Sequence, residues 1–365
     1  MKKLIFSMFM FILMFTFSCK KKAENKVTKK KNTKITVKSD YNLKPSKVTQ
    51  EQINALSEIF SFGDNLLKER RKIQKKIQDL AKNFKDFGAV FTLKKDSPYK
   101  YTRVSYFPTS VWTTIYADEK KEEDKKLFWI IVSYRFNLNK NERSIYKDDF
   151  EGFKARHLKD EWVWILLDNN IEIKISAYSD KTKKDEELKK VLKSFDTEAM
   201  KNLFAKDSKN AKLRNYLLKI KELNSKIMDI NKKFSEKEKD AVKALKPFLN
   251  FNEGVLKGID LNQIRYNISN TFNIYAKKNR KSLFTVYIGR EANILGAANF
   301  FNRKDAKYGN MGNFKYLSIE DRTVMVKLPS LIVKINTFYK NEYRNKDKLM
   351  KIMAEFDLIG LSKVK

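Results

Sequence analysis

The segment LKKVLKSFD at residues 188–196 returns as LMKIMAEFD at residues 349–357, and this return decides the fold that we predict. Shorter blocks recur upstream in the same order: Ile115-Tyr116-Ala117 as Ile274-Tyr275-Ala276, Leu127-Phe128 as Leu283-Phe284, and Ile173-Lys174-Ile175 as Val333-Lys334-Ile335. The spacing between the two sets stays nearly constant, apart from a deletion near Arg280. Blocks that keep their order and spacing indicate two copies of one domain.

Each copy opens with a long amphipathic helical pattern. Apolar residues recur at helical spacing, in the first copy at Ile59, Leu66, Ile73, Ile77, Leu80 and Phe84, and in the second at Tyr216, Ile220, Leu223, Ile227, Ile230 and Phe234. The remaining face of both helices is densely charged. The pattern leaves open whether the two helices pack on each other as an antiparallel pair or each on its own sheet.

The middle of each copy changes to runs rich in β-branched and aromatic residues, which predict antiparallel strands. These runs cover residues 104–116, 127–137, 162–167 and 171–178, and then 263–276, 283–290, 324–328 and 331–339. Polar turns at Asp168-Asn169-Asn170 and Pro329-Ser330 predict a hairpin in each copy. Short helices over residues 184–195 and 346–356 are expected to close the copies.

The predicted fold class is therefore α+β, with two tandem duplicated domains over residues 51–207 and 208–365. Each has a long N-terminal amphipathic helix, an antiparallel β-meander and a short C-terminal helix. The last strand and helix of each copy, ending in Ser194-Phe195-Asp196 or Glu355-Phe356-Asp357, resemble the end of PsbP-like α+β domains. That resemblance implies a fold only and transfers no functional residue.

Residues 1–19 have the features of a bacterial lipoprotein signal. Lys2 and Lys3 precede an uncharged apolar stretch over residues 4–17, and Ser18 stands directly before Cys19. The apolar stretch is shorter than the roughly 20 residues of a membrane span. Cys19 is the only cysteine, so it can form no intrachain disulfide. We expect Cys19 to be lipidated, the alternative being a cleaved secretory signal with an incidental cysteine.

The charge balance is strongly basic. The chain carries 78 Lys and Arg against 44 Asp and Glu, a net charge of +34. Such a charge attracts polyanions, although an export signal makes nucleic acid a poor candidate. The excess is mostly Lys and comes with many Asn, Ile and Phe, a mixture that an AT-rich genome also produces. Residues 20–50 are rich in Lys and predict a basic flexible tether, or a bare spacer.

Few residues suggest catalysis. His157 is the only histidine, which argues against a catalytic triad and a histidine-bound metal and indicates a structural role. The chain has no phosphate-binding GxxxxGK[ST] loop. The acidic runs at residues 118–124 and 148–151 lack the spacing of an EF-hand, and Gly309 and Gly312 read as a loop tip. We expect no metal, no cofactor and no enzymatic activity.

Two features are candidates for ligand recognition. Five cations share a face of the first long helix and could meet sulfate or phosphate groups, namely Lys68, Arg71, Lys72, Lys75 and Lys76. The alternative is the ordinary solvated face of an amphipathic helix. Trp112, near Pro108 in an expected loop, would be a contact residue if exposed, and Trp162 and Trp164 fall on the same face of one strand.

The residues before the cysteine depart from the usual lipobox of bacterial lipoproteins, because Phe15 stands where Leu is usual and Thr16 and Phe17 follow. This relaxed lipobox resembles those of spirochaetes. Together with the lysine tether and the composition, it makes the chain similar to Borrelia-type surface lipoproteins. This resemblance implies a lipid-anchored, non-enzymatic protein of the outer membrane, displayed on the cell surface, that binds a host or envelope ligand. A polyanionic glycan, an anionic lipid or a protein would fit. The alternative is a periplasm-facing lipoprotein with a structural or assembly role in the envelope, and an enzyme is the third hypothesis.

Overall fold

The structure is a computed structural model of the chain. It describes residues 41, 43–82, 84, 91–94, 96–99, 103–116, 126–135, 138–205, 210–249, 259–279, 281–294, 306–338 and 343–365. The predicted signal with Cys19, most of the predicted tether and the acidic run at residues 118–124 lie outside these residues. The residues described belong to one unit, which covers residues 39–365.

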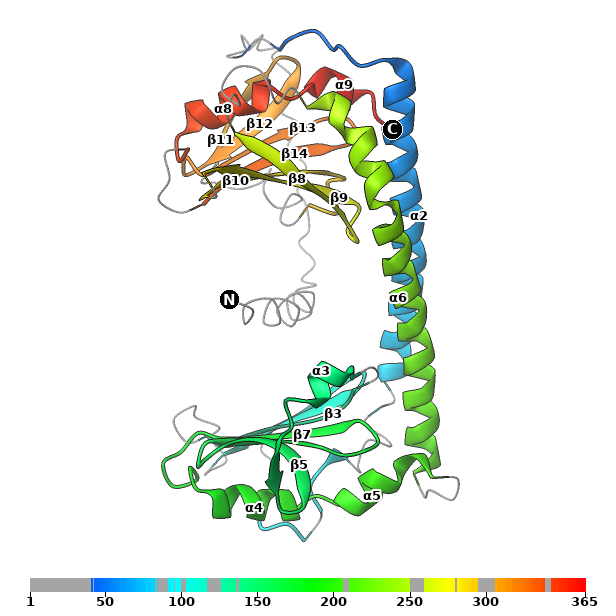
Figure 1. The fold of residues 1–365 in the computed structure, drawn as a ribbon, viewed down its shortest axis with the longest axis vertical. Coiled ribbons are helices and arrows are strands. Elements are labelled where there is room, and N and C mark those ends of the chain that lie inside the picture. The colour runs from blue at the N-terminus through cyan, green and yellow to red at the C-terminus, as the bar shows by residue number, and fades with distance from the viewer. Residues whose placement is uncertain are drawn as a thin grey trace, which may run out of the picture. The chain divides into compact units, whose positions relative to one another are not determined.

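Two long helices follow the apolar spacing of the sequence. Helix α2 (Gln50–Ala81) begins at Thr49, whose side chain and that of Gln52 cap each other's main-chain N–H groups. Helix α6 (Ala211–Leu245) is followed by the short 3-10 helix η5 (Lys246–Phe248). The two helices lie side by side and run in opposite directions (Figure 1). The antiparallel pair is therefore the correct one of the two expected arrangements.

Each end of this helix pair contacts a different sheet. Near the start of α2, the ring of Phe60 packs edge-on against Phe272 of the second half, with 5.6 Å between ring centroids. Beyond the end of α2, the ring of Phe84 stacks on Tyr216 of α6 at 5.0 Å, and the Tyr216 hydroxyl donates to the carbonyl of Pro108 in the first half at 2.7 Å. The helix pair and the residue Phe84 that follows α2 therefore contact both halves.

Seven described strands form the first sheet, in the order β1-β2-β3-β7-β6-β5-β4. The strands are β1 (Arg103–Phe107), β2 (Ser110–Tyr116), β3 (Lys126–Tyr134), β4 (Asp148–Phe150), β5 (Phe153–Leu158), β6 (Trp162–Leu166) and β7 (Ile171–Ala177). All neighbouring strands are antiparallel. The short helix α3 (Lys140–Arg143) lies between β3 and β4.

The second sheet also has seven strands among the described residues, in the order β11-β12-β13-β14-β10-β9-β8. They are β8 (Asp260–Asn267), β9 (Thr271–Lys278), β10 (Lys281–Gly289), β11 (Lys307–Met311), β12 (Phe314–Ile319), β13 (Thr323–Lys327) and β14 (Ile332–Thr337). When each strand is matched by its place along the chain, this order is that of the first sheet. The molecule is therefore α+β with two similar halves.

The arrangement is not a simple meander. In the first half, β1 to β3 form one antiparallel run and β4 to β7 form another, and the pairing of β3 with β7 joins the two runs. The second half repeats this with β10 and β14. Registers agree as well, because Val132 pairs with Ile173 as Ile288 pairs with Val333. The recurring Ile-Lys-Ile and Val-Lys-Ile blocks thus occupy equivalent places.

Helices α4 (Asp185–Lys193) and α8 (Lys346–Ala354) lie where closing helices were predicted. The repeated Phe-Asp pair then starts another short helix, α5 (Thr197–Lys201) or α9 (Leu358–Ser362), which the sequence prediction missed. Asp196 and Asp357 each accept a hydrogen bond from a main-chain N–H in that helix. The 3-10 helix η4 (Asn202–Phe204) follows α5.

One hydrophobic cluster of the described residues runs through both halves and both long helices. In the first sheet it takes one face, which includes Ile171, Ile173 and Ile175 of β7, and α4 contacts this strand and adds Leu188 and Val191 to the cluster. No helix in the described part of the chain is long and apolar enough to cross a membrane.

Candidate functional site

The five predicted cations on α2, Lys68, Arg71, Lys72, Lys75 and Lys76, are all exposed and are called the basic stripe below. The apolar residues beside them, Ile73 and Ile77, are buried against the rest of the fold. Arg71 donates to the side-chain oxygen of Asn293 at 3.4 Å. Among the described residues, none of the five forms an ion pair with a carboxylate.

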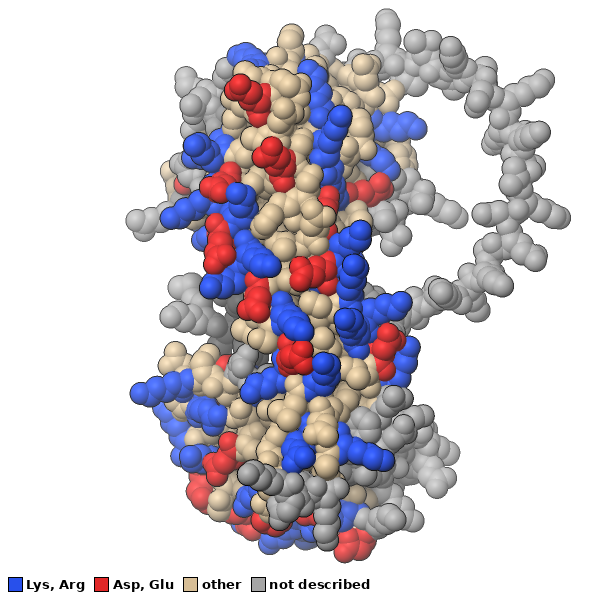
Figure 2. Space-filling model, turned by 90° about the vertical axis from the view of Figure 1, so that its right-hand side faces the viewer, with Lys and Arg blue, Asp and Glu red and all other residues tan. Residues whose placement is uncertain are grey.

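Helix α6 differs in this respect. Its Glu222 accepts from both Lys219 and Lys226, at 3.0 and 2.7 Å, and Asp240 accepts from Lys237 at 2.7 Å. Figure 2 shows the face that carries the two helices, where basic side chains run along its length with fewer acidic ones between them. The positive charge of α6 is therefore partly neutralised within the helix, whereas that of the basic stripe is not.

Trp112 is not in a loop, so that prediction is wrong. It lies in β2, immediately after the Pro108-Thr109 turn, and is half-buried. Its indole N–H donates to the Ser110 hydroxyl at 3.1 Å, and its ring packs on Phe107 at 4.6 Å. Strand β2 begins at Ser110, and Val111 is buried in the core. Because side chains alternate along a strand, Trp112 points to the opposite face of the sheet.

All four tryptophans of the chain lie on one face of the first sheet, here called the tryptophan face. The register places Trp164 opposite Lys174, Lys174 opposite Ile131, and Ile131 opposite Trp112. The neighbouring row joins Trp162 through Ser176 to Trp129. This face is the one opposite the hydrophobic core, and each of the four indoles is half-buried.

Cations lie directly against these rings. The guanidinium of Arg156 lies 5.4 and 5.1 Å from the ring centroids of Trp162 and Trp164. The amine of Lys174 lies 4.2 Å from the centroid of Trp164. Cations at such distances are attracted to the electron-rich face of the indole, by about 0.5–2 kcal/mol. The tryptophan face is thus both aromatic and positively charged.

A buried carboxylate anchors the cations at one side of this face. Glu172 of β7 is 1% exposed and pairs with Arg135 at 3.3 Å and with Lys174 at 3.2 Å. The hydroxyl of Tyr146 also donates to Glu172. Burial, and then the neighbouring Glu172 charge, raises the pKa of Tyr146 far above its ordinary value, so this phenol stays protonated. The network fixes Lys174 beside Trp164.

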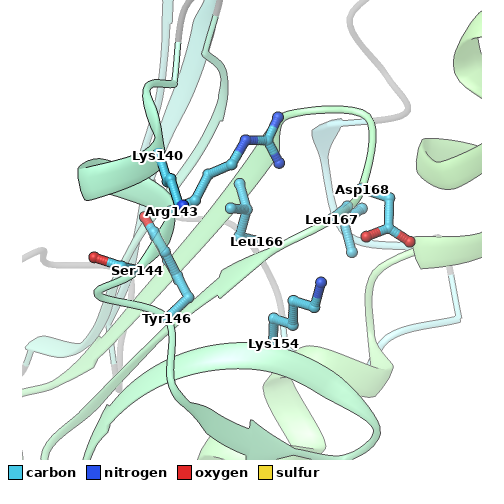
Figure 3. Close-up of a pocket in the computed structure, with 8 residues that line it drawn as sticks. All are labelled: Lys140, Arg143, Ser144, Tyr146, Lys154, Leu166, Leu167 and Asp168. Carbon is cyan, nitrogen blue, oxygen red and sulfur yellow. The ribbon is translucent and has the colours of Figure 1, made fainter.

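A cavity of about 300 Å³ lies next to this network (Figure 3). Its charged lining consists of Lys140, Arg143 and Lys154 with a single carboxylate, Asp168. Tyr146 forms part of the wall, so the cavity borders the Glu172 network. A cavity with more cations than carboxylates can accept a carboxylate, sulfate or phosphate group.

The equivalent face of the second sheet is different. The registers match Trp112, Trp129, Trp162 and Trp164 to Asn273, Thr285, Thr323 and Met325. There, Met325 belongs to a small hydrophobic cluster that includes Ile294, from the segment after β10. In the second sheet, Ile294 therefore covers part of this face. Lys334 occupies the position on β14 that Lys174 occupies on β7.

The other candidate residues show no reactive arrangement. The ring nitrogen Nε2 of His157 lies 2.8 Å from the Asp185 carboxylate, and its ring packs on Phe150. The same carboxylate accepts the main-chain N–H of Asp160. Within the described ranges, no three His, Cys, Asp or Glu residues are grouped to hold a metal ion. His157 joins β5 to the start of α4.

No protein-family model, curated protein or solved structure matches this chain. The assignment of a function therefore depends on the residues themselves. The alternation along one strand predicted that Trp162 and Trp164 share a face, but it did not place Trp112 and Trp129 beside them. The strand order was the missing information, because β3 and β7 pair across an interval that contains three other strands.

Proposed function

We propose that this protein is a lipid-anchored, non-enzymatic lipoprotein of the outer envelope that binds a polyanionic ligand through the basic stripe. The observation that carries the proposal is the exposure of five neighbouring cations on α2 without a carboxylate partner among the described residues. The net charge of +34 and the lysine-rich segment at residues 20–50 support attraction to the same class of ligand.

The experiment compares two sets of charge reversals in the full chain. The first set changes Lys68, Arg71, Lys72, Lys75 and Lys76 to Glu, and the matched set changes Lys29, Lys30, Lys31, Lys34 and Lys38 to Glu. Binding to heparin and to anionic vesicles is measured over a range of salt concentrations. We expect the first set to weaken binding much more than the second, because a site concentrates charge whereas diffuse attraction does not. Equal losses would contradict a site on the stripe.

Salt and stability provide two further checks. Binding should fall steeply with ionic strength, since exposed charges are screened over about 8 Å in physiological salt. The melting temperature of the stripe variant should change little, because exposed substitutions usually alter stability by less than about 0.5 kcal/mol. A variant that loses binding and stability together would not support the proposal.

The lipid anchor has its own test. Cys19→Ala should abolish lipid labelling and move the protein from the detergent phase to the aqueous phase, because stable anchoring requires more than one acyl chain. A variant that still partitions into detergent would contradict lipidation at Cys19. Protease treatment of intact cells then separates the cell surface from the periplasm-facing alternative, since only a surface protein is cleaved.

We also propose that the two halves arose by duplication of one domain, over residues 51–207 and 208–365. Each copy has its long helix first, then the strands and then the closing helices. Matching strand orders, matching registers at Ile173 and Val333, and the shared Phe-Asp pair before α5 and α9 support this. The duplication explains how one copy could retain a covered face while the other acquired the tryptophans.

A further inference from the structure

We propose that the tryptophan face binds an acidic glycan, with sugar rings packed on the indoles and acidic groups at the adjoining cations. The site is separate from the basic stripe on α2 and does not depend on it.

The aromatic residues supply the first part of the argument. Trp112 and Trp129 are half-buried on the face opposite the core, and their rings meet edge-on at 5.7 Å. Small hydroxyl residues lie in or next to the tryptophan rows on the same face, namely Ser105, Ser110, Thr114, Ser133 and Ser176. A sugar ring has an apolar face and a rim of hydroxyls, so indoles interspersed with hydroxyl side chains match both of its surfaces.

The second sheet shows that the fold does not require these tryptophans. Asn273, Thr285, Thr323 and Met325 occupy the matching positions in the same strand order. Where that face is apolar, the chain covers it with Ile294. In the first sheet, large aromatic side chains are half-exposed among the described residues, and aromatic side chains on a surface are typical of binding sites.

The positive charge on and beside the tryptophan face favours an acidic ligand. Arg156 and Lys174 lie against the tryptophans, and Lys140, Arg143 and Lys154 line the cavity beside them. The carboxylate of Glu172 is buried and already paired with two cations, so it offers little negative charge to a ligand. The face is therefore complementary to a chain that alternates sugar rings with carboxylate or sulfate groups.

Ring orientation favours a glycan over single-stranded nucleic acid. The planes of Trp112 and Trp129 are inclined at 86°, and those of Trp162 and Trp164 at 36°. Successive bases stack best on aromatic platforms that follow one another along the strand. A glycan turns at each glycosidic bond and can place successive rings on indoles of different inclination.

Intrinsic fluorescence tests the proposal, because all four tryptophans of the chain lie on this face. The full-length protein is titrated with an oligosaccharide of glucuronic acid units and with its carboxyl-reduced, neutral counterpart. An oligodeoxynucleotide of equal charge serves as the third probe. We expect a saturable change in emission with the acidic sugar only. No saturable change, equal binding of the neutral sugar, or equal binding of the oligonucleotide would each overturn the proposal.

Variants then test whether the ligand binds at the tryptophan face. Their binding is measured by calorimetry, because Trp112→Leu removes one of the fluorescent residues. Trp112→Leu and the exposed double variant Lys140→Gln, Lys154→Gln should each weaken binding about tenfold or more. Tyr275→Leu, a half-buried aromatic on the matching face of the second sheet, is the control and should bind normally. Normal binding by the double variant, whose changes are at the surface, would exclude the site even if Trp112→Leu were unstable.

The basic-stripe reversals separate this inference from the proposed function. They should leave the binding of the acidic oligosaccharide nearly unchanged after correction for net charge. If they abolish it, the ligand binds α2 and the tryptophan face is not the site.

Discussion

Asn270 donates its side-chain amide to the main-chain carbonyl of Phe60 at 2.9 Å, across 210 positions of sequence. Asn270 is fully buried in the turn between β8 and β9, and it adopts a positive φ of 55°. The same amide donates to the Asp64 carboxylate at 2.8 Å, and Asp64 in turn accepts from Arg290 at 3.1 Å. The turn between β8 and β9 of the second sheet is thus hydrogen-bonded to the main chain of α2.

Gly63 allows this close approach. A Cβ atom built on Gly63 would lie 2.2 Å from the Asn270 side-chain oxygen and 2.4 Å from the Tyr266 hydroxyl. Gly63→Ala should therefore destabilise the protein by roughly 1–3 kcal/mol, despite the better helix propensity of Ala. Chemical denaturation measures the change. Gln74→Ala, at an exposed position of the same helix, is the control and should be neutral or slightly stabilising.

Asn270→Gly separates the hydrogen bonds from the backbone conformation. Glycine adopts the positive φ without strain but cannot donate to Phe60 or Asp64, so we expect a loss of about 2 kcal/mol. Asn279→Gly is the matched control, because Asn279 also has a positive φ, of 50°, yet is exposed. Similar effects of the two substitutions would mean that the turn conformation, and not the contact with α2, determines stability.

Glu172 should be the carboxylate whose loss is most costly on the first sheet. Glu172→Gln leaves Arg135 and Lys174 without their buried partner, and we expect a loss of about 2–4 kcal/mol, less than for a fully buried pair because both cations are partly exposed. Glu142→Gln removes the more exposed partner of Arg135 and should cost no more than about 1 kcal/mol. Thermal melts of both variants make the comparison, and equal losses would count against the buried network.

We expect the contribution of the contact between His157 and Asp185 to the stability of the fold to depend on pH. Burial alone would raise the pKa of Asp185, but the main-chain N–H of Asp160 and the ring of His157 lower it below 3.8 overall. A carboxyl whose pKa is lower in the folded state contributes stability above its unfolded pKa, and this contribution is lost as the pH falls through the folded pKa.

Asp185→Asn should therefore be less stable than the unmodified protein by about 1 kcal/mol at pH 7. The difference should shrink as the pH is lowered below about 4. Denaturation midpoints at several pH values test this. A difference that stays constant down to pH 2 would show that the ionised carboxylate is not what stabilises the fold.

The sequence was most informative where one period persists over many residues. The spacing from Ile59 to Phe84 predicted α2, and the recurring blocks predicted two similar halves. The hairpins β4–β5 and β11–β12 were missed. In β4 and β11 the reason is that Asp148-Asp149 and Gly309-Asn310 are not typical strand residues. Their strands lie at a sheet edge, where pairing with a single neighbour suffices. Tertiary contact therefore outweighs local preference at these positions.

The sequence predicted the basic stripe but not the tryptophan face, because only the basic stripe depends on local spacing. Helical spacing alone groups the basic stripe, so its shared exposure could be anticipated. The tryptophan face depends on pairing between β3 and β7, which are separated by residues 135–170, and no local pattern contains that pairing. The place of α2 against the second sheet was also invisible, since Gly63 and Asn270 carry no sign of their contact.

Ser57, near the start of α2, accepts a hydrogen bond from the main-chain N–H of Lys365, 308 positions later. A ribosome adds about 5–20 residues per second, so the two sides of this contact are synthesised roughly 15–60 s apart. For most of that interval the strands that bury Phe60, such as β9 with Phe272, have not been synthesised. The apolar surface of this helix is therefore exposed to solvent on the nascent chain until the second sheet has been made.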